Sequence, residues 1–158
     1  MEKTCFKKGA VGAIIAVLLI LLDYVTKQAA IAKLKGQEAI VLWKGVFELR
    51  YLENRGAAFG MFQGRYLFLI IFTIVILLLI AYLYFKRIPA ERRFFWLNFA
   101  CMLFFAGAIG NLIDRIVNGY VVDFLYFKLI DFPVFNVADC YVTIACALLI
   151  IFCVFVIN

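Results

Sequence analysis

Histidine and serine are both absent from the 158-residue sequence. Ser-His and Ser-Lys hydrolases, Cys-His proteases and His-Glu zinc peptidases each need one of these residue types, so all of these classes are excluded. A hydrolase built from this chain has to use Asp, Glu, Lys, Arg, Tyr, Thr, Cys or Asn. The remaining route with good precedent is a pair of carboxyl groups that activates water, one ionised and the other protonated.

Charge is also scarce in the chain. Charged residues make up 16% and apolar residues 68%, and the mean hydropathy of +1.06 lies far above that of soluble domains. Four segments are close to the roughly 20 residues that a helix needs to cross a bilayer: 9–32, 66–85, 94–113 and 140–157. The sequence therefore predicts an all-α membrane protein with four transmembrane helices in a single domain, residues 1–158.

The first of these segments has a second interpretation. Lysines at positions 3, 7 and 8 precede its apolar stretch, as in a cleaved signal peptide. We favour a permanent helix, because no small-residue cleavage site follows and because Asp23 and Lys27 lie four residues apart on one helical face. An acid placed before a base at this spacing forms a favourable ion pair. We expect the pair to be structural and to tie the first helix to the bundle.

The lysines and arginines of the short loops predict how the chain is oriented in the membrane. Basic residues gather at the amino terminus and again at positions 86, 87, 92 and 93, between the second and third spans. The positive-inside rule places both regions, and therefore both termini, in the cytoplasm. The remaining loops, about 33–65 and 114–139, then face outward. The net charge of +6 reflects this topology, and no nucleic-acid partner is expected.

The first outer loop contains a predicted strand. Side chains alternate between apolar and polar over 46–53, which favours a small extracytoplasmic β-sheet in this loop. The strand runs into Asn54 and Gly56, residue types that permit tight turns. Several aromatic residues suggest that the loop lies on the membrane surface and closes over a substrate: Trp43, Phe47, Tyr51 and Phe59.

Acids gather in the second outer loop. Asp114, Asp123, Asp131 and Asp139 all fall at the same predicted membrane face. Two neighbouring carboxyls share a proton because repulsion raises one pKa, but spacing alone does not choose the pair. Asp114 beside Arg115 at a helix end is more typical of a structural partner.

Asp123 and Asp139 can each be interpreted either as a catalytic residue or as an acid without a role in catalysis. Asp123 is either a solvated loop acid or, since valines precede it and Phe124 follows, a carboxyl that holds its proton in an apolar setting. Asp139 lies in a predicted first helical turn with Asn136 as the cap. Its carboxylate would then complement the helix dipole whether or not it reacts.

Five motifs in order carry a family resemblance: Asp23-Tyr-Val-Thr-Lys27, Asn54-Arg-Gly56-Ala-Ala-Phe59, Gly107-Ala-Ile-Gly110-Asn111-Leu-Ile-Asp114-Arg115, Val121-Val-Asp123-Phe124 and Phe135-Asn136-Val-Ala138-Asp139. Together they resemble the lipoprotein signal peptidases, the bacterial signal peptidase II family. The resemblance implies an aspartic endopeptidase with Asp123 and Asp139 as the catalytic dyad. It also implies supporting roles for one group of residues: Asn54, Gly56, Asn111, Arg115 and Asn136. Asp23, Lys27 and Asp114 are then structural.

Two positions depart from the family pattern. Ala106-Gly107 stands where the family usually has two glycines, and Cys140 stands where a serine often follows the last aspartate. Neither departure changes the predicted dyad.

The same resemblance implies a substrate and a location. The substrate is a prolipoprotein that already carries a diacylglyceryl group, cleaved before the lipidated cysteine. Membrane lipids and globomycin-type inhibitors are the other expected partners, and no metal and no cofactor are expected. The enzyme would lie in the bacterial cytoplasmic membrane with its active site at the outer face, where an apolar groove receives the acyl chains.

Two rival functions stay open at this stage. A small proton-coupled exporter would place an essential acid near the middle of a span, whereas the interiors of 66–85, 94–113 and 140–157 are uncharged. A membrane scaffold without activity would leave the clustered acids unexplained.

Overall fold

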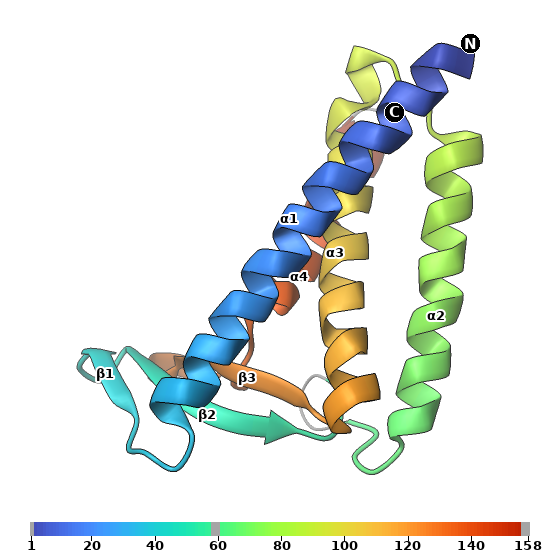
Figure 1. Cartoon of the computed structure of the whole chain (residues 1–158). Helices are drawn as coiled ribbons and strands as arrows, with labels where there is room; N and C mark the ends of the chain where they lie inside the picture. Colours follow the sequence, from blue (N-terminus) through green and yellow to red (C-terminus); the bar gives the residue numbers. More distant parts are fainter. Residues whose placement is uncertain (1, 58–60, 156–158) are drawn as a thin grey trace.

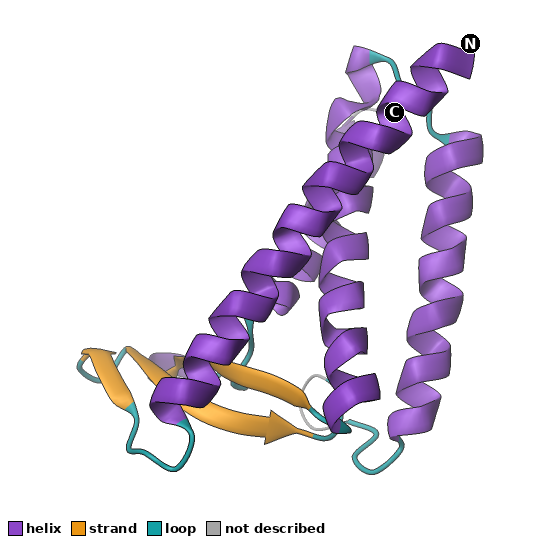
Figure 2. Cartoon of the chain, in the orientation of Figure 1, coloured by secondary structure: helices purple, strands orange, loops and turns teal. Residues whose placement is uncertain are grey.

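Four long helices and a three-stranded antiparallel sheet make up the computed structural model (Figures 1 and 2). The structure describes residues 2–57 and 61–155, with side chains from residue 9 onward. The helices are α1 (Glu2–Leu34), α2 (Tyr66–Tyr82), α3 (Phe95–Asn118) and α4 (Val137–Phe155). The strands are β1 (Ile40–Trp43), β2 (Phe47–Asn54) and β3 (Val121–Phe127). Short helical turns cover Leu83–Arg87, Arg92–Phe94 and Lys128–Ile130.

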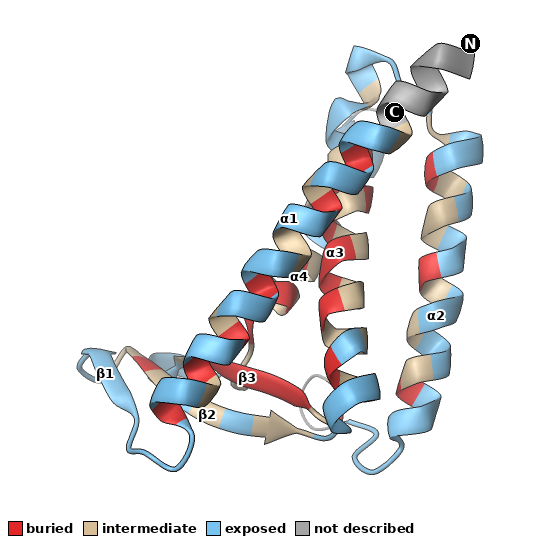
Figure 3. Ribbon diagram, viewed as in Figure 1, coloured by how far each residue is buried: buried red, intermediate tan, exposed pale blue. Residues whose placement is uncertain are grey.

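The four predicted spans are confirmed, since the described chain has four helices long and apolar enough to cross a membrane. Their outward faces carry exposed apolar side chains such as Ile14, Leu18 and Leu78, and the buried positions face the bundle (Figure 3). This arrangement suits lipid as the solvent. The chain enters and leaves at one end of the bundle, and the sheet lies at the other end (Figure 1).

The end of α3 and the start of α4 differ from the prediction. Helix α3 continues past residue 113 to Asn118, and α4 begins at Val137 rather than at residue 140. The earlier start of α4 follows from a reciprocal cap. Asn136 Oδ1 accepts the Asp139 N–H at 2.9 Å, and Asp139 Oδ2 accepts the Asn136 N–H at 3.0 Å. Asn136 is therefore the cap that the sequence suggests.

The predicted sheet is confirmed, with β1 and β2 in the first outer loop, and it extends beyond that loop. Strand β3 comes from the second outer loop and completes the strand order β1-β2-β3. Its pairing with β2 sets Asp123 opposite Leu52 and Val121 opposite Asn54. A short strand buried on both sides lacks the alternation that marks a half-exposed one, so the sequence pattern did not reveal it. As a result, Asp123 lies on a strand instead of in a loop.

Helix α3 is the centre of the bundle, because it packs against each of the other three helices. Its contact with α4 is close. A Cβ atom at Gly107 would overlap the backbone carbonyl of Ala138, and one at Gly110 would lie 2.5 Å from Asp23 Oδ2. Ala106, where the family has a glycine, is fully buried in the core between α3 and α4, so its methyl group fits.

Gly107→Ala tests this close approach. The added methyl group meets rigid backbone, so we expect it to destabilise the fold by about 1–3 kcal/mol, as overpacking in a core does. The measurement is thermal unfolding of the purified protein in detergent. Gly9→Ala is the matched control, because its methyl group would meet the Phe85 ring at 3.3 Å, where a side chain can adjust. Equal melting temperatures for the two variants would contradict the packing argument.

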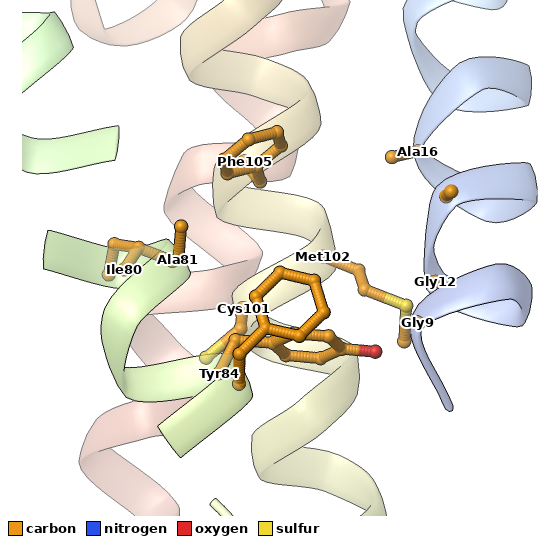
Figure 4. A pocket seen from close by; sticks show the side chains of 11 residues that line it. Gly9, Gly12, Ala16, Ile80, Ala81, Tyr84, Cys101, Met102 and Phe105 are labelled. Atoms are coloured by element: carbon orange, nitrogen blue, oxygen red, sulfur yellow. The ribbon is translucent and has the colours of Figure 1, made fainter. Parts of the chain in front are cut away.

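An apolar cavity of about 200 Å³ lies between α1, α2 and α3. Small residues of α1, Gly12 and Ala16, line this cavity together with Tyr84 from the turn that continues α2 (Figure 4). No acidic side chain is among the described residues that line this cavity. The cavity therefore does not support carboxylate chemistry.

Candidate active site

A cleft of about 1070 Å³ lies where α3, α4 and the sheet meet. Its polar wall brings together residues from β2, α3, β3 and α4: Asn54, Asn111, Arg115, Asp123 and Asp139. Apolar residues complete the lining, with Ile130, Phe132, Val142 and Ile144 among them. The cleft therefore combines polar groups with apolar surface.

Asp123 is the most enclosed acid of the cleft, with 1% of its surface exposed. Both of its oxygens accept hydrogen bonds. Asn136 Nδ2 donates to Oδ1 at 2.6 Å, and Asn54 Nδ2 donates to Oδ2 at 2.8 Å. Burial, and after it the neighbouring charge of Asp139, together raise the pKa of Asp123 to about 7. This carboxyl is therefore ready to carry a proton near neutral pH.

Asp139 lies in the first turn of α4, where the helix dipole favours negative charge. Asn111 Nδ2 donates to its Oδ1 at 2.8 Å, and the Asn136 backbone N–H donates to Oδ2. Asn136 is fully buried and contacts both acids, Asp123 through its side chain and Asp139 through its cap. One asparagine thus fixes the relative positions of two carboxyls from separate elements.

Arg115 holds the segment that follows β2. Its Nη2 donates to the Gly56 carbonyl at 3.0 Å, and the Gly56 N–H donates to Asn54 Oδ1 at 2.9 Å. The same Asn54 side chain reaches Asp123. Arg115 Nε is buried and has no hydrogen-bond partner among the described residues. Phe59, which the sequence placed over the site, lies outside the described residues.

The predicted ion pair of Asp23 and Lys27 is present at 2.8 Å and is buried. It extends further than the sequence suggested. Lys27 also pairs with Asp114 at 3.0 Å. Asp23 Oδ1 accepts the Ala138 N–H at the start of α4, and Asp114 Oδ2 accepts the Val122 N–H of β3. These contacts join α1, α3, α4 and β3 directly behind the acids of the cleft.

The remaining acid of the second outer loop lies elsewhere. Asp131 accepts a hydrogen bond from the Tyr126 hydroxyl at 2.6 Å and does not line the cleft. Conversely, sequence reasoning missed Gln63 and Thr143 as lining residues, since neither stands in a distinctive pattern. Arg55 also lines the cleft, and its place inside the Asn54–Gly56 motif was an available signal. No described cluster of three or more His, Cys, Asp or Glu side chains could hold a metal ion.

Fold and site together define a multi-pass membrane protein with two aspartates, one buried and one half-buried, in a cleft at one end of its helices. The family model of signal peptidase (SPase) II matches residues 15–155. The chain belongs to this signal peptidase II family and is a peptidase-type hydrolase.

Individual relatives agree with the family model. The lipoprotein signal peptidase of Clostridium tetani is 50% identical over 143 residues, 88% of this chain and 89% of the relative. The lipoprotein signal peptidase of Halothermothrix orenii is 45% identical, over 88% of this chain and 92% of the relative. A bacterial membrane enzyme solved by the in meso method at 2.3 Å resolution superposes with a TM-score of 0.82 at 34% identity, covering 92% of this chain and 88% of the other. A second bacterial membrane enzyme, solved by the same method at 1.9 Å resolution, superposes with a TM-score of 0.79 at 35% identity. The match covers 90% of this chain and 91% of the other.

Proposed function

We propose that this protein is a membrane aspartic endopeptidase that removes the signal peptide from diacylglyceryl-modified prolipoproteins, cutting before the lipidated cysteine. The observation that carries the proposal is the pair of acids, buried Asp123 on β3 and half-buried Asp139 on α4, which Asn136 holds in one cleft. The names of the relatives supply the substrate class. With histidine and serine absent from the chain, an acid pair is the remaining route to peptide hydrolysis with good precedent.

The two acids have different surroundings and therefore different roles. Asp123 carries the shared proton, because burial raises its pKa to about 7. Asp139 receives two N–H donors and the dipole of α4, which suit an ionised base. Asp139 takes a proton from water, and the resulting hydroxide attacks the scissile carbonyl while Asp123 donates its proton to the carbonyl oxygen. The proton taken up by Asp139 then passes to the leaving amine as the C–N bond breaks, and one hydroxyl of the tetrahedral intermediate returns its proton to Asp123, which restores the starting state.

The cleft also suits a lipidated substrate. Arg115 and Asn54 line the cleft and can contact the substrate backbone. The apolar lining residues Phe132, Val142 and Ile144 can receive acyl chains, which favour an apolar groove over water.

The basic residues support an outward-facing site. Lys86, Arg87 and Arg92 lie in the α2–α3 connection, at the end of the bundle where α1 begins (Figure 1). By the positive-inside rule this end is cytoplasmic. Both termini then lie inside, and the cleft opens at the outer face, where a prolipoprotein presents its modified cysteine.

The exporter alternative finds less support. Asp23, the acid placed deepest along a span, is paired with Lys27 and accepts the Ala138 N–H, so it is held in place and neutralised. Asp123 and Asp139 line the cleft at the end of the helices instead. A midplane site for a transported proton is therefore not favoured.

The direct test compares two precursors that differ in the diacylglyceryl group alone. We expect the purified protein in lipid-detergent micelles to cleave the modified precursor at least about 100-fold faster, because the acyl chains supply binding energy at the groove. Mass spectrometry of the products should place the lipidated cysteine at the new amino terminus. Equal cleavage of both precursors, or a cut elsewhere, would overturn the proposed specificity. Asp123→Asn protein prepared in parallel excludes a contaminating protease.

A further inference from the structure

Lys27 is a buried cation whose three N–H donors are all in use. The ammonium lies 2.8 Å from Asp23 Oδ2 and 3.0 Å from Asp114 Oδ2, and it donates to Asn111 Oδ1 at 3.0 Å. Its exposed fraction is 1%. The two carboxylates already neutralise the charge, so the contact with Asn111 needs a further explanation.

Asn111 connects Lys27 to Asp139. Its Oδ1 accepts from Lys27 and from Asn136 Nδ2, the latter at 3.1 Å, and its Nδ2 donates to Asp139 Oδ1 at 2.8 Å. Turning this amide over would place its NH₂ group against two other donors and its oxygen against the carboxylate. Lys27 therefore helps to decide which end of Asn111 faces Asp139.

The charges around the cleft are unbalanced. Four carboxyl groups, those of Asp23, Asp114, Asp123 and Asp139, lie close to two cations, Lys27 and Arg115. Other titratable or charged side chains near the cleft are Glu53, Arg55 and Cys140. Excess negative charge in a buried cluster is relieved by binding protons. A loss of Lys27 would leave Arg115 as the nearest countercharge and would make the acids hold protons more tightly.

We propose that Lys27 is a positioning residue for the cleavage reaction, which orients Asn111 against Asp139 and supplies the countercharge that keeps one acid of the pair ionised. The inference rests on the proposed function, since it concerns the same two acids. It extends the role of Lys27 beyond joining helices. The positive charge of Lys27 also lowers the pKa of Asp123, in agreement with the geometry.

The pH dependence of cleavage separates positioning from a purely structural role. For Lys27→Gln we expect kcat to fall about 10- to 100-fold with KM nearly unchanged, the usual effect of losing a group that orients a reacting one. Both limbs of the pH–rate profile should move to higher pH by about one unit, because an opposite charge has been removed from the acids. Lys27→Arg keeps the charge and should return the limbs to their wild-type positions. A role limited to holding helices together would reduce the rate at every pH without moving the limbs.

A second variant keeps the test valid if Lys27→Gln does not fold. Lys27→Gln leaves Asp23 buried without its cation, so the double variant Lys27→Gln/Asp23→Asn is made alongside it. The amide oxygen introduced at position 23 can still accept the Ala138 N–H. The limbs should move in the same direction but by less, because the carboxylate removed from position 23 offsets part of the lost positive charge. The control is Lys128→Gln, which breaks the pair of Lys128 with Glu48 at 2.6 Å, outside the cleft lining, and should leave the profile unchanged.

The outcomes distinguish this inference from the proposed function. A folded Lys27→Gln or double variant with wild-type kcat and unmoved limbs overturns the role of Lys27, while inactive Asp123→Asn and Asp139→Asn proteins leave the acid pair standing. Activity in either aspartate variant overturns the proposed function itself. A shift of both limbs with reversal by Lys27→Arg supports the inference.

Discussion

Replacing Asp123 or Asp139 by asparagine should reduce the rate of signal-peptide release at least about 1000-fold, the scale of losing a general acid or base together with its partner. Asparagine has nearly the same shape as aspartate but can neither take up nor release the proton that the reaction moves. At position 123 it also turns an NH₂ group toward Asn54 or Asn136, each of which already donates to this side chain. The measurement is the initial rate on diacylglyceryl-modified precursor, with the melting temperature recorded for each variant.

Asp131→Asn is the matched control for this experiment. Asp131 belongs to the same segment between α3 and α4 as Asp123. It accepts a hydrogen bond from the Tyr126 hydroxyl and does not line the cleft. The same chemical change there should leave the rate close to wild type. A folded Asp123→Asn or Asp139→Asn protein that keeps more than about a tenth of the wild-type rate would remove that residue from the dyad.

The sequence predicted the helices well, because lipid imposes a simple rule: long uncharged runs become spans. All four helices were found, and Asn136 was identified as a cap from its residue type and position. Strand β3 was missed, because Val121–Phe127 is too short and too evenly buried to show a period. Its partner β2 was found, since apolar and polar residues alternate along most of its sequence. Pairing between strands far apart in sequence is fixed by the three-dimensional arrangement and leaves little local signal.

The site was predictable in its residue types but not in its contacts. The acids and asparagines could be named from motifs, and the structure brings Asp123, Asp139, Asn54 and Asn111 into one cleft. Their hydrogen bonds join residues up to 84 positions apart, as between Lys27 and Asn111, so spacing could not reveal them. Lys27 was predicted to be paired with Asp23 four residues before it, a local relation. Its contacts with Asp114 and Asn111 depend on how α1 and α3 pack.

The rate of cleavage should follow a bell-shaped dependence on pH, because the pair works with a single shared proton. Below about pH 7 Asp123 holds its proton, and the pair is active as long as Asp139 stays ionised. As the pH rises through the pKa of Asp123, the general acid is lost and the rate should fall about tenfold per pH unit. At low pH the second proton binds, the general base is lost, and the rate falls again.

Asn54→Ala identifies the group behind the alkaline limb. Asn54 Nδ2 bonds to Asp123 Oδ2 at 2.8 Å and lowers the pKa of this carboxyl by favouring its ionised form. Without that bond the pKa of Asp123 rises, so the alkaline limb should move to higher pH. The check is a profile of initial rates between about pH 5 and pH 9 with saturating substrate. A limb that stays in place in Asn54→Ala would show that a group other than Asp123 loses the proton, and a flat wild-type profile would contradict the shared-proton mechanism.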